Sequence, residues 1–279
     1  MDGNRLNTVH GLDKLQLLDT LSMRSQDASF VAIFEQHVHA RSLYLSSNNV
    51  PSLVLPHSCH SVQNLELASC GLQELSPDFG LKFPNLRTLN ASFNAIKDLR
   101  PLLNITRLET LHVPGNRISR LRKTIATLAR MQHLRNFDAR DNPFTLGFYP
   151  PPATAAALSE CNAHSLVRSP SPSEDHESET ETQIQQRAAK LYLLPLADPM
   201  VDAQHCGRLD DEAKMRRRVY ELLLSQSSRS LEALDGLALN RKRVITRDGL
   251  WNRLVELGVM KKSQHGGIRV NTPMCELEV

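Results

Sequence analysis

The sequence is poor in aromatic residues, which make up 5% of its 279 residues and include a single tryptophan. It has no apolar run of about 18 residues, so we expect no membrane-spanning helix. The first ten residues, MDGNRLNTVH, lack the apolar centre of a signal peptide. With 41% hydrophobic and 23% charged residues, the composition is that of a folded protein whose core is built from aliphatic side chains.

Cysteine is also scarce, with five residues at wide spacings and no C-x-x-C pair. An odd number without close pairs argues against a disulfide framework and for a reducing compartment, the cytosol or nucleus. HSCH at 57–60 is the one cluster that resembles metal ligands. It lacks a second pair at zinc-finger spacing, so we expect no metal and no cofactor.

Leucine, in contrast, is abundant and regularly spaced. The pattern L-x-x-L-x-L-x-x-N-x-L occurs in LNASFNAIKDL (89–99) and most clearly in LETLHVPGNRISRL (108–121). The residues at the asparagine position are separated by 22, 22, 22, 24, 22 and 26 residues. This period predicts an α/β leucine-rich-repeat solenoid with short parallel strands on the concave face, short helical or 3-10 turns on the convex face and a helical C-terminal cap. The residues at the asparagine position are Asn4, Gln26, Asn48, Cys70, Asn94, Asn116 and Asn142.

The asparagine position has a structural explanation. After each strand the chain turns away, and the turn leaves buried backbone groups that need partners. A buried Asn can bond these groups and link one repeat to the next, and a Cys can do so less completely. We therefore expect a structural ladder rather than a functional site, made of Asn48, Cys70, Asn94, Asn116 and Asn142.

A period near 22 leaves little room for long helices on the convex side. The exception is TIATLARMQHL (124–134), where Ile125, Leu128, Ala129 and Leu134 fit one face of a short helix. At the other end, Asn4 already occupies the asparagine position. We therefore expect the array to continue upstream of Met1 in a longer protein; an irregular N-terminal cap is the alternative.

The array breaks at ARDNPFTLGFYPPP (139–152), where three prolines end the repeat pattern. We predict a repeat array at 1–152, a polar, acidic, disordered insertion at 153–190, a C-terminal repeat and helical cap at 191–260, and a tail at 261–279. Within the cap, 210–230 and 247–259 read as amphipathic helices, the second with Leu250, Leu254 and Leu257 on its apolar side.

The strand residues that flank the inward leucines face outward and are candidates for protein contacts. This face is neither apolar nor strongly basic, and solvated strand residues are the alternative interpretation. The candidates are Arg24, Tyr44, Glu66, Asn90, His112, Asp138 and Arg140.

Charged and modifiable segments offer further candidates. The basic groups KMRRR (214–218), RKR (241–243) and KK (261–262) could bind an acidic or phosphorylated partner or form a solvated helix face. Nucleic acid is disfavoured because no aromatic platform accompanies the charge. Ser169 and Ser171 each precede a proline and are candidate phosphosites for proline-directed kinases.

Several stretches together resemble one family. They are NRLNTVHGL, LSMRSQ, DARDNPFTLGFYPPP and, after a polar gap, RLDDEAKMRRRVYELLL and LEALDGL. They are similar to the fungal spindle-pole-body scaffold of the septation-initiation and mitotic-exit network, whose vertebrate relatives include centriolin. The resemblance covers about residues 4–260, and the long N-terminal region of such scaffolds has no counterpart in this sequence.

The resemblance implies a non-enzymatic protein-binding platform at the spindle pole body, cytoplasmic and cytoskeleton-associated, that holds parts of a GTPase–kinase cascade. The sequence itself carries no GxGxxG, GxxxxGK[ST], HExxH or GxSxG motif, so we expect no enzymatic activity and no small-molecule substrate. Two alternatives stay open: a leucine-rich-repeat regulatory subunit of a protein phosphatase, and a ribonucleoprotein subunit.

Overall fold

A computed structural model describes residues 2–4, 6, 9–26, 39–51, 53, 57–150, 197–262 and 268–270. The predicted insertion at 153–190, with Ser169 and Ser171, lies outside the described residues, as does most of the predicted tail. The domain boundaries given above stay predictions.

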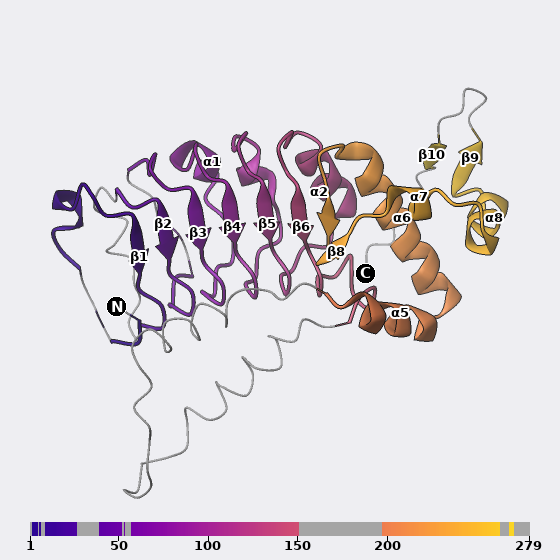
Figure 1. Ribbon diagram of the computed structural model, residues 1–279, viewed down its shortest axis with the longest axis horizontal. Coiled ribbons are helices and arrows are strands. Elements are labelled where there is room, and N and C mark those ends of the chain that lie inside the picture. The colour runs from indigo at the N-terminus through magenta and orange to yellow at the C-terminus, as the bar shows by residue number, and fades with distance from the viewer. Residues whose placement is uncertain are drawn as a thin grey trace, which may run out of the picture.

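The repeats form one sheet whose strands follow one another in chain order (Figure 1). Strands β1 to β6 are parallel, and the leucine at the centre of each strand is in register with that of the next, ending on Phe137 in β6. These central side chains are buried and stack into an aliphatic core. The predicted solenoid is confirmed. Its strands are β1 (Thr20–Ser22), β2 (Ser42–Tyr44), β3 (Asn64–Glu66), β4 (Thr88–Asn90), β5 (Thr110–His112) and β6 (Asn136–Asp138).

The residues at the asparagine position link neighbouring repeats through hydrogen bonds. The Asn116 amide donates to the Ala91 carbonyl in the preceding repeat at 2.9 Å and to the Val113 carbonyl at 3.0 Å. Its oxygen accepts from the Ile96 amide at 3.0 Å. One side chain thus satisfies three backbone groups that the turn would leave buried and unpaired.

Cys70 stands in this ladder with a weaker side chain. Its thiol contacts the Leu45 carbonyl at 3.3 Å but has no counterpart to the amide oxygen. The Val50 amide donates instead to the Cys70 backbone carbonyl at 2.9 Å. Burial raises the pKa of the Cys70 thiol to about 12, which keeps it an uncharged structural group.

In these turns the residue immediately before the asparagine position has a left-handed backbone conformation, with positive φ. These residues are Ser25, Ser47, Ser69, Phe93, Gly115 and Asp141. At Gly115 the requirement for glycine is steric. A Cβ atom there would lie 2.5 Å from the ring of Phe93 in the neighbouring repeat.

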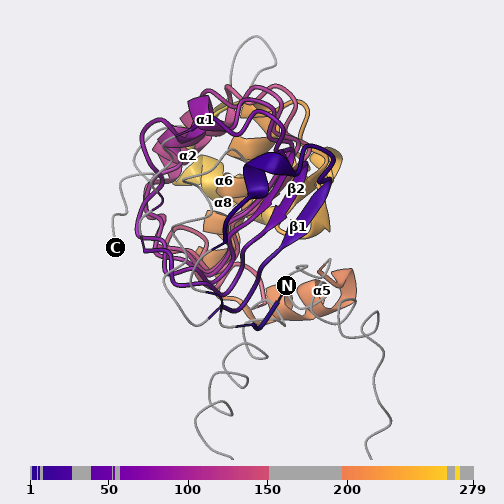
Figure 2. The same ribbon diagram turned by 90° about the vertical axis from the view of Figure 1, so that its left-hand side faces the viewer.

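Short helices lie between the strands along the chain. They are η1 (Leu12–Lys14), α1 (Phe79–Lys82), η3 (Arg100–Leu102) and α2 (Leu121–Leu128). Of these, α1 and α2 cover the side opposite the strands (Figure 2). Helix α2 begins three residues before the predicted span and ends before Met131. Leu128 and Leu134 are buried as expected, whereas Ala129 is exposed because it follows the last helical turn.

The C-terminal region continues the same sheet. Strand β7 (Ala233–Leu234) pairs in parallel with β6 and turns back into β8 (Leu237–Ala238). Helices α5 (Pro199–Arg208), α6 (Asp211–Ser227), α7 (Arg241–Val244) and α8 (Gly249–Glu256) surround this end (Figure 1). Strands β9 (Met260–Lys262) and β10 (Ile268–Val270) form a separate antiparallel pair.

Helix α6 joins two apolar clusters. Tyr220 and Leu224 belong to the core of the repeats, where the Tyr220 ring lies 5.8 Å from that of Phe144. Met215, Val219 and Leu222 belong to a second cluster with Trp251 and Leu254 of α8. The expectation for Leu257 is wrong, since this side chain follows α8 and is exposed, and Trp251 packs inward instead.

Candidate functional site: the outward face of the strands

The outward positions of the strands form one row across the sheet. Each member is in register with the next. In order along the sheet they are Ser22, Tyr44, Glu66, Asn90, His112 and Asp138. Two residues after the first and last members of this row lie Arg24 and Arg140. The structure therefore brings the predicted contact residues onto one face, which we call the strand face: Arg24, Tyr44, Glu66, Asn90, His112, Asp138 and Arg140.

At the N-terminal end of the strand face the charges pair with one another. The Arg24 guanidinium donates two hydrogen bonds to the Glu66 carboxylate, at 2.7 and 2.9 Å, and lies 4.6 Å from the centre of the Tyr44 ring. The Ser46 hydroxyl donates to the same carboxylate at 2.6 Å. Arg24 and Glu66 are both buried, so neither presents a free charge.

His112 lies toward the C-terminal end of the strand face, in register with Asp138. Its Nδ1 atom is buried and has no hydrogen-bond partner in the described part of the chain. Burial lowers the pKa of His112; the nearby Asp138 carboxylate opposes this and Arg140 adds to it. A neutral imidazole with one unpaired nitrogen can accept or donate a single hydrogen bond.

At the C-terminal end a second buried cluster forms. Arg140 donates to the Asp138 carboxylate, with Nη2 at 2.7 Å from Oδ2. Asp235, from the turn between β7 and β8, accepts from the Ala139 amide at 2.7 Å and from the Tyr220 hydroxyl at 2.8 Å. Burial raises the pKa of Asp235 to about 7, and the Asp138 charge adds to the effect. Asp235 was not among the predicted site residues.

In the predicted basic group KMRRR of α6, two of the four cations form ion pairs within the fold. Arg217 donates two hydrogen bonds to the Asp202 carboxylate of α5, at 3.0 and 2.7 Å, and one to Glu221 at 2.9 Å. Arg218 donates to the Thr246 carbonyl at 3.0 Å, and its Nη2 lies 3.3 Å from Asp248 Oδ2. These two arginines hold helices together and are not free to bind an acidic partner.

Arg241 in the RKR group also forms hydrogen bonds within the fold. Its guanidinium donates to the carbonyls of Ser228, at 3.0 Å, and Leu231, at 2.7 Å. It therefore bonds the chain where it leaves α6 and approaches β7. Sequence alone could not reveal this, because the acceptors are backbone carbonyls that any residue type supplies.

The described residues contain neither a group of metal ligands nor a membrane-spanning helix. No three His, Cys, Asp or Glu side chains gather there as metal ligands. In HSCH, Cys59 is buried and burial raises the pKa of its thiol to about 11, whereas His60 is exposed. In that same part of the chain, none of the helices combines the length and apolar character needed to cross a bilayer.

Together, the parallel sheet of three-residue strands β1 to β6, the aliphatic core and the asparagine ladder define the fold class: the chain folds as a leucine-rich-repeat solenoid. The family model described as Leucine Rich repeats (2 copies) matches residues 84–130.

Within this class the chain is similar to the septation initiation network scaffold protein cdc11 of Schizosaccharomyces pombe, with 35% identity over 153 residues. The match covers 54% of this chain and 14% of that protein. The resemblance expected from the break and the repeats is confirmed.

Two further similarities are partial. Leucine-rich repeat-containing protein 56 of Homo sapiens is 36% identical over 121 residues, which are 42% of this chain and 22% of that protein. The crystal structure of human 5T4 (Wnt-activated inhibitory factor 1, trophoblast glycoprotein) has 24% sequence identity and a TM-score of 0.41, and the match covers 51% of this chain and 59% of that one. The chain thus spans less than a quarter of the length of either sequence relative.

Proposed function

We propose that this chain is the leucine-rich-repeat part of a non-enzymatic scaffold that holds protein components of a GTPase–kinase cascade at the spindle pole body. The similarity to the septation initiation network scaffold carries the proposal, because it extends over 153 residues and more than half of this chain. The fold agrees with it, since a solenoid offers an extended surface on which several proteins can bind.

The strand face supports a role in binding rather than in catalysis. Its ionisable groups are paired with one another at both ends, and His112, which lies beside Asp138, leaves its Nδ1 atom without a hydrogen-bond partner among the described residues. We propose His112 and the half-buried Tyr44 as the contacts that the strand face offers to a protein partner.

Localisation through the cell cycle tests this function. We expect the full-length protein, carrying a fluorescent tag in the cells from which it comes, to mark both spindle poles in mitosis. The variant Leu111→Asp places a charge in the centre of the core and should lose the signal together with the fold. A tagged wild-type protein that stays diffuse throughout mitosis would contradict the proposal.

The same cells separate the two alternatives. Stoichiometric co-purification of a phosphatase catalytic subunit without pole localisation would indicate a phosphatase regulator. Salt-sensitive retention of RNA would indicate a ribonucleoprotein subunit.

A further inference from the structure

Cations are strongly concentrated in the middle of the array. Between Lys97 and Arg135 the sequence contains nine Lys and Arg but only two carboxylates, Asp98 and Glu109. Both carboxylates are already paired: Asp98 accepts from Arg100, and Glu109 accepts from Arg87 at 2.8 Å. Of the nine cations, Arg100 is paired with Asp98 and Arg135 with Glu232, so most of this positive charge has no carboxylate partner among the described residues.

Six of these cations are exposed and, within the described residues, form neither an ion pair nor a side-chain hydrogen bond, whereas Arg107 is hydrogen-bonded to Asn85. This contrasts with Arg217 and Arg218 of the cap, which are buried in ion pairs. Cations left unpaired on a surface keep their full charge available to a ligand. The six are Lys97, Arg117, Arg120, Arg122, Lys123 and Arg130.

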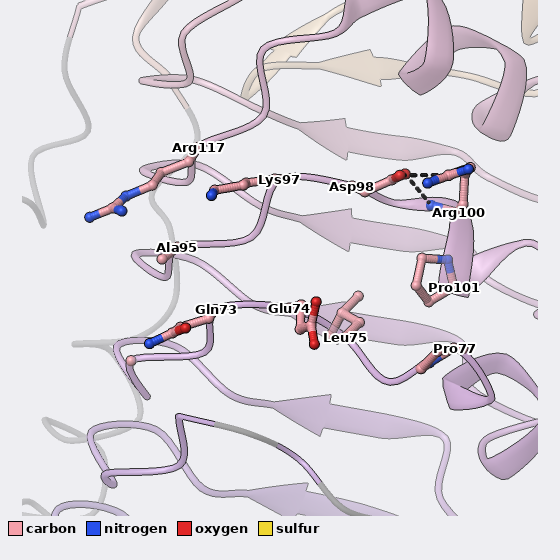
Figure 3. Close-up of a pocket in the computed structure, with 11 residues that line it drawn as sticks. Gln73, Glu74, Leu75, Pro77, Ala95, Lys97, Asp98, Arg100, Pro101 and Arg117 are labelled. Atoms are coloured by element: carbon pink, nitrogen blue, oxygen red, sulfur yellow. Dashed lines mark hydrogen bonds and ion pairs between the residues drawn. The ribbon is translucent and has the colours of Figure 1, made fainter.

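Two of the six line a groove on the outside of the solenoid, beyond the asparagine ladder. The groove has a volume of about 930 Å³ and is formed by three successive repeats. Gln73, Lys97 and Arg117 come one from each repeat and point the same way along it (Figure 3). Pro77 and Pro101 contribute apolar wall at the other side of the groove.

The charge across the groove is uneven. At one side, Lys97 and Arg117 form no ion pair with any described residue, while Arg100 is paired with Asp98. Glu74 is the single carboxylate of the lining without an ion pair among the described residues. A negatively charged ligand is therefore favoured at Lys97 and Arg117 and disfavoured at Glu74.

The dimensions fit an extended peptide. Neighbouring repeats are about 4.8 Å apart, so the three repeats span about 10 Å, the length of about three residues in a β-strand. Alternate side chains of such a peptide face the same way, and carboxylates there would meet Lys97 and Arg117. The groove lining contains no aromatic ring on which a nucleic-acid base could stack, which favours peptide over single-stranded nucleic acid.

We propose that this groove, here called the basic groove, binds an extended segment of a partner protein rich in Asp and Glu, with Lys97 and Arg117 as its main contacts. The inference goes beyond the scaffold role at the spindle pole and does not depend on it. It also moves the expected site for an acidic partner from the C-terminal cap to the middle of the array.

Fluorescence anisotropy with a defined peptide tests the proposal on the full chain. The probe is a fluorescein-labelled peptide about eight residues long in which Glu and Val alternate, and its control has Gln in place of every Glu. We expect the wild-type protein to bind the Glu peptide at least about tenfold more tightly than the Gln peptide. Raising the salt from 0.1 to 1 M, which shortens the Debye length from about 10 to 3 Å, should remove most of this difference.

Two matched variants locate the binding. The double variant Lys97→Glu with Arg117→Glu should weaken binding of the Glu peptide at least about tenfold. The double variant Lys242→Glu with Arg247→Glu makes the same change in net charge at exposed positions of the cap and should leave binding within about twofold of wild type. All four substitutions fall on exposed residues, and circular dichroism checks that each variant is folded.

Several results would overturn the proposal: equal losses in the two double variants, equal binding of the Glu and Gln peptides, or no binding of either by wild type. A phosphoserine peptide of the same length that binds the groove more tightly than the Glu peptide would assign the groove to phosphate instead. A single-stranded oligonucleotide that displaces the Glu peptide at lower concentration would assign it to nucleic acid. None of these results bears on localisation to spindle poles.

Discussion

Asp235 is a fully buried carboxyl group at the C-terminal end of the strand face. The groups that surround it are the Asp138 carboxylate, the Arg140 guanidinium and the hydroxyls of Tyr149 and Tyr220. Burial and Asp138 raise its pKa from 3.8 to about 7, against the hydrogen bonds from Ala139 and Tyr220. The folded protein therefore keeps a proton on this group at pH values where the unfolded chain releases it.

This shift predicts how stability depends on pH. A carboxyl whose pKa is raised by folding gives its full stabilising contribution below pH 4 and loses it as the pH rises to about 7. In the variant Asp235→Asn the side chain is uncharged at every pH, so this decrease in stability with rising pH should be absent. Between pH 5 and 7, the unfolding free energy of wild type should fall relative to the variant by up to about 1.4 kcal/mol per pH unit.

Urea unfolding at pH 5, 6 and 7 measures the difference. The control is Asp211→Asn, an exposed carboxylate paired with Arg253, which should follow wild type. Parallel pH profiles for wild type and Asp235→Asn would show that Asp235 titrates normally in the folded protein.

Single residues were predictable from the sequence where their role repeats. Asn48, Asn94, Asn116 and Asn142 all bond backbone carbonyls of the preceding repeat, because the same turn recurs at each repeat and leaves the same groups unpaired. Asp235 is not part of this repeating pattern of about 22 residues. The LDG stretch around it signals a turn, but its burial depends on Tyr220, which belongs to another element.

Among the elements, helix α6 shows how much of a helix the periodic spacing of apolar residues can predict. The pattern predicts a helix over 210–230, and the structure has Asp211–Ser227 with Asp210 as its N-cap. The buried face is wider than the apolar stripe, because Arg217, Arg218 and Glu221 are buried as well. Two apolar clusters pack against this helix, so polar residues between them are enclosed too.

Arg217 is expected to be critical for the cap. It bonds Asp202 and Glu221, and its guanidinium lies 4.1 Å from the centre of the Tyr149 ring. The variant Arg217→Met leaves two buried carboxylates without their cation, so the free energy of unfolding should fall by about 3–5 kcal/mol. Chemical denaturation at pH 7 measures this loss.

The neighbouring Arg216 provides a matched control. It is half-buried, forms no ion pair within the described residues and lies 5.7 Å from the centre of the Phe148 ring. The variant Arg216→Met should cost less than about 1 kcal/mol. Equal effects of the two substitutions would show that the buried ion pairs do not hold the cap in place.

At the scale of the whole molecule, one sheet joins segments far apart in the sequence. The Glu232 amide donates to the Arg135 carbonyl at 2.7 Å, and the Asp235 amide donates to the Phe137 carbonyl at 2.8 Å. Leu231 and Leu234 enter the same core as the repeats. The C-terminal strands therefore cover the edge that β6 would otherwise expose.

This arrangement predicts that the two segments assemble without a covalent link. Residues 1–150 and 197–279, produced together as separate chains with one affinity tag, should co-purify in equal amounts. Residues 1–150 alone should aggregate, because they expose the edge of β6 and the apolar surface around Phe144 and Phe148.

Two substitutions in the shorter chain separate core packing from other effects. Leu231→Asp places a charge in the shared core and should abolish co-purification, whereas Ala238→Asp falls on an exposed position and should not. Stable, soluble residues 1–150 that do not bind the second chain would contradict the single solenoid.

The repeat period, the ladder and the order of the strands can be read from the sequence, because each depends on residues about 22 positions apart that recur with the same environment. Whether a charged side chain is paired within the protein or free to bind a ligand is decided only by the tertiary structure. Arg24 pairs with Glu66 two repeats away, Arg217 pairs with Asp202 on another helix, and Lys97 and Arg117 pair with no carboxylate in the part of the chain that the structure describes. Whether a cation is paired depends on distances of a few ångströms between residues far apart in sequence, and the folded chain alone sets those distances.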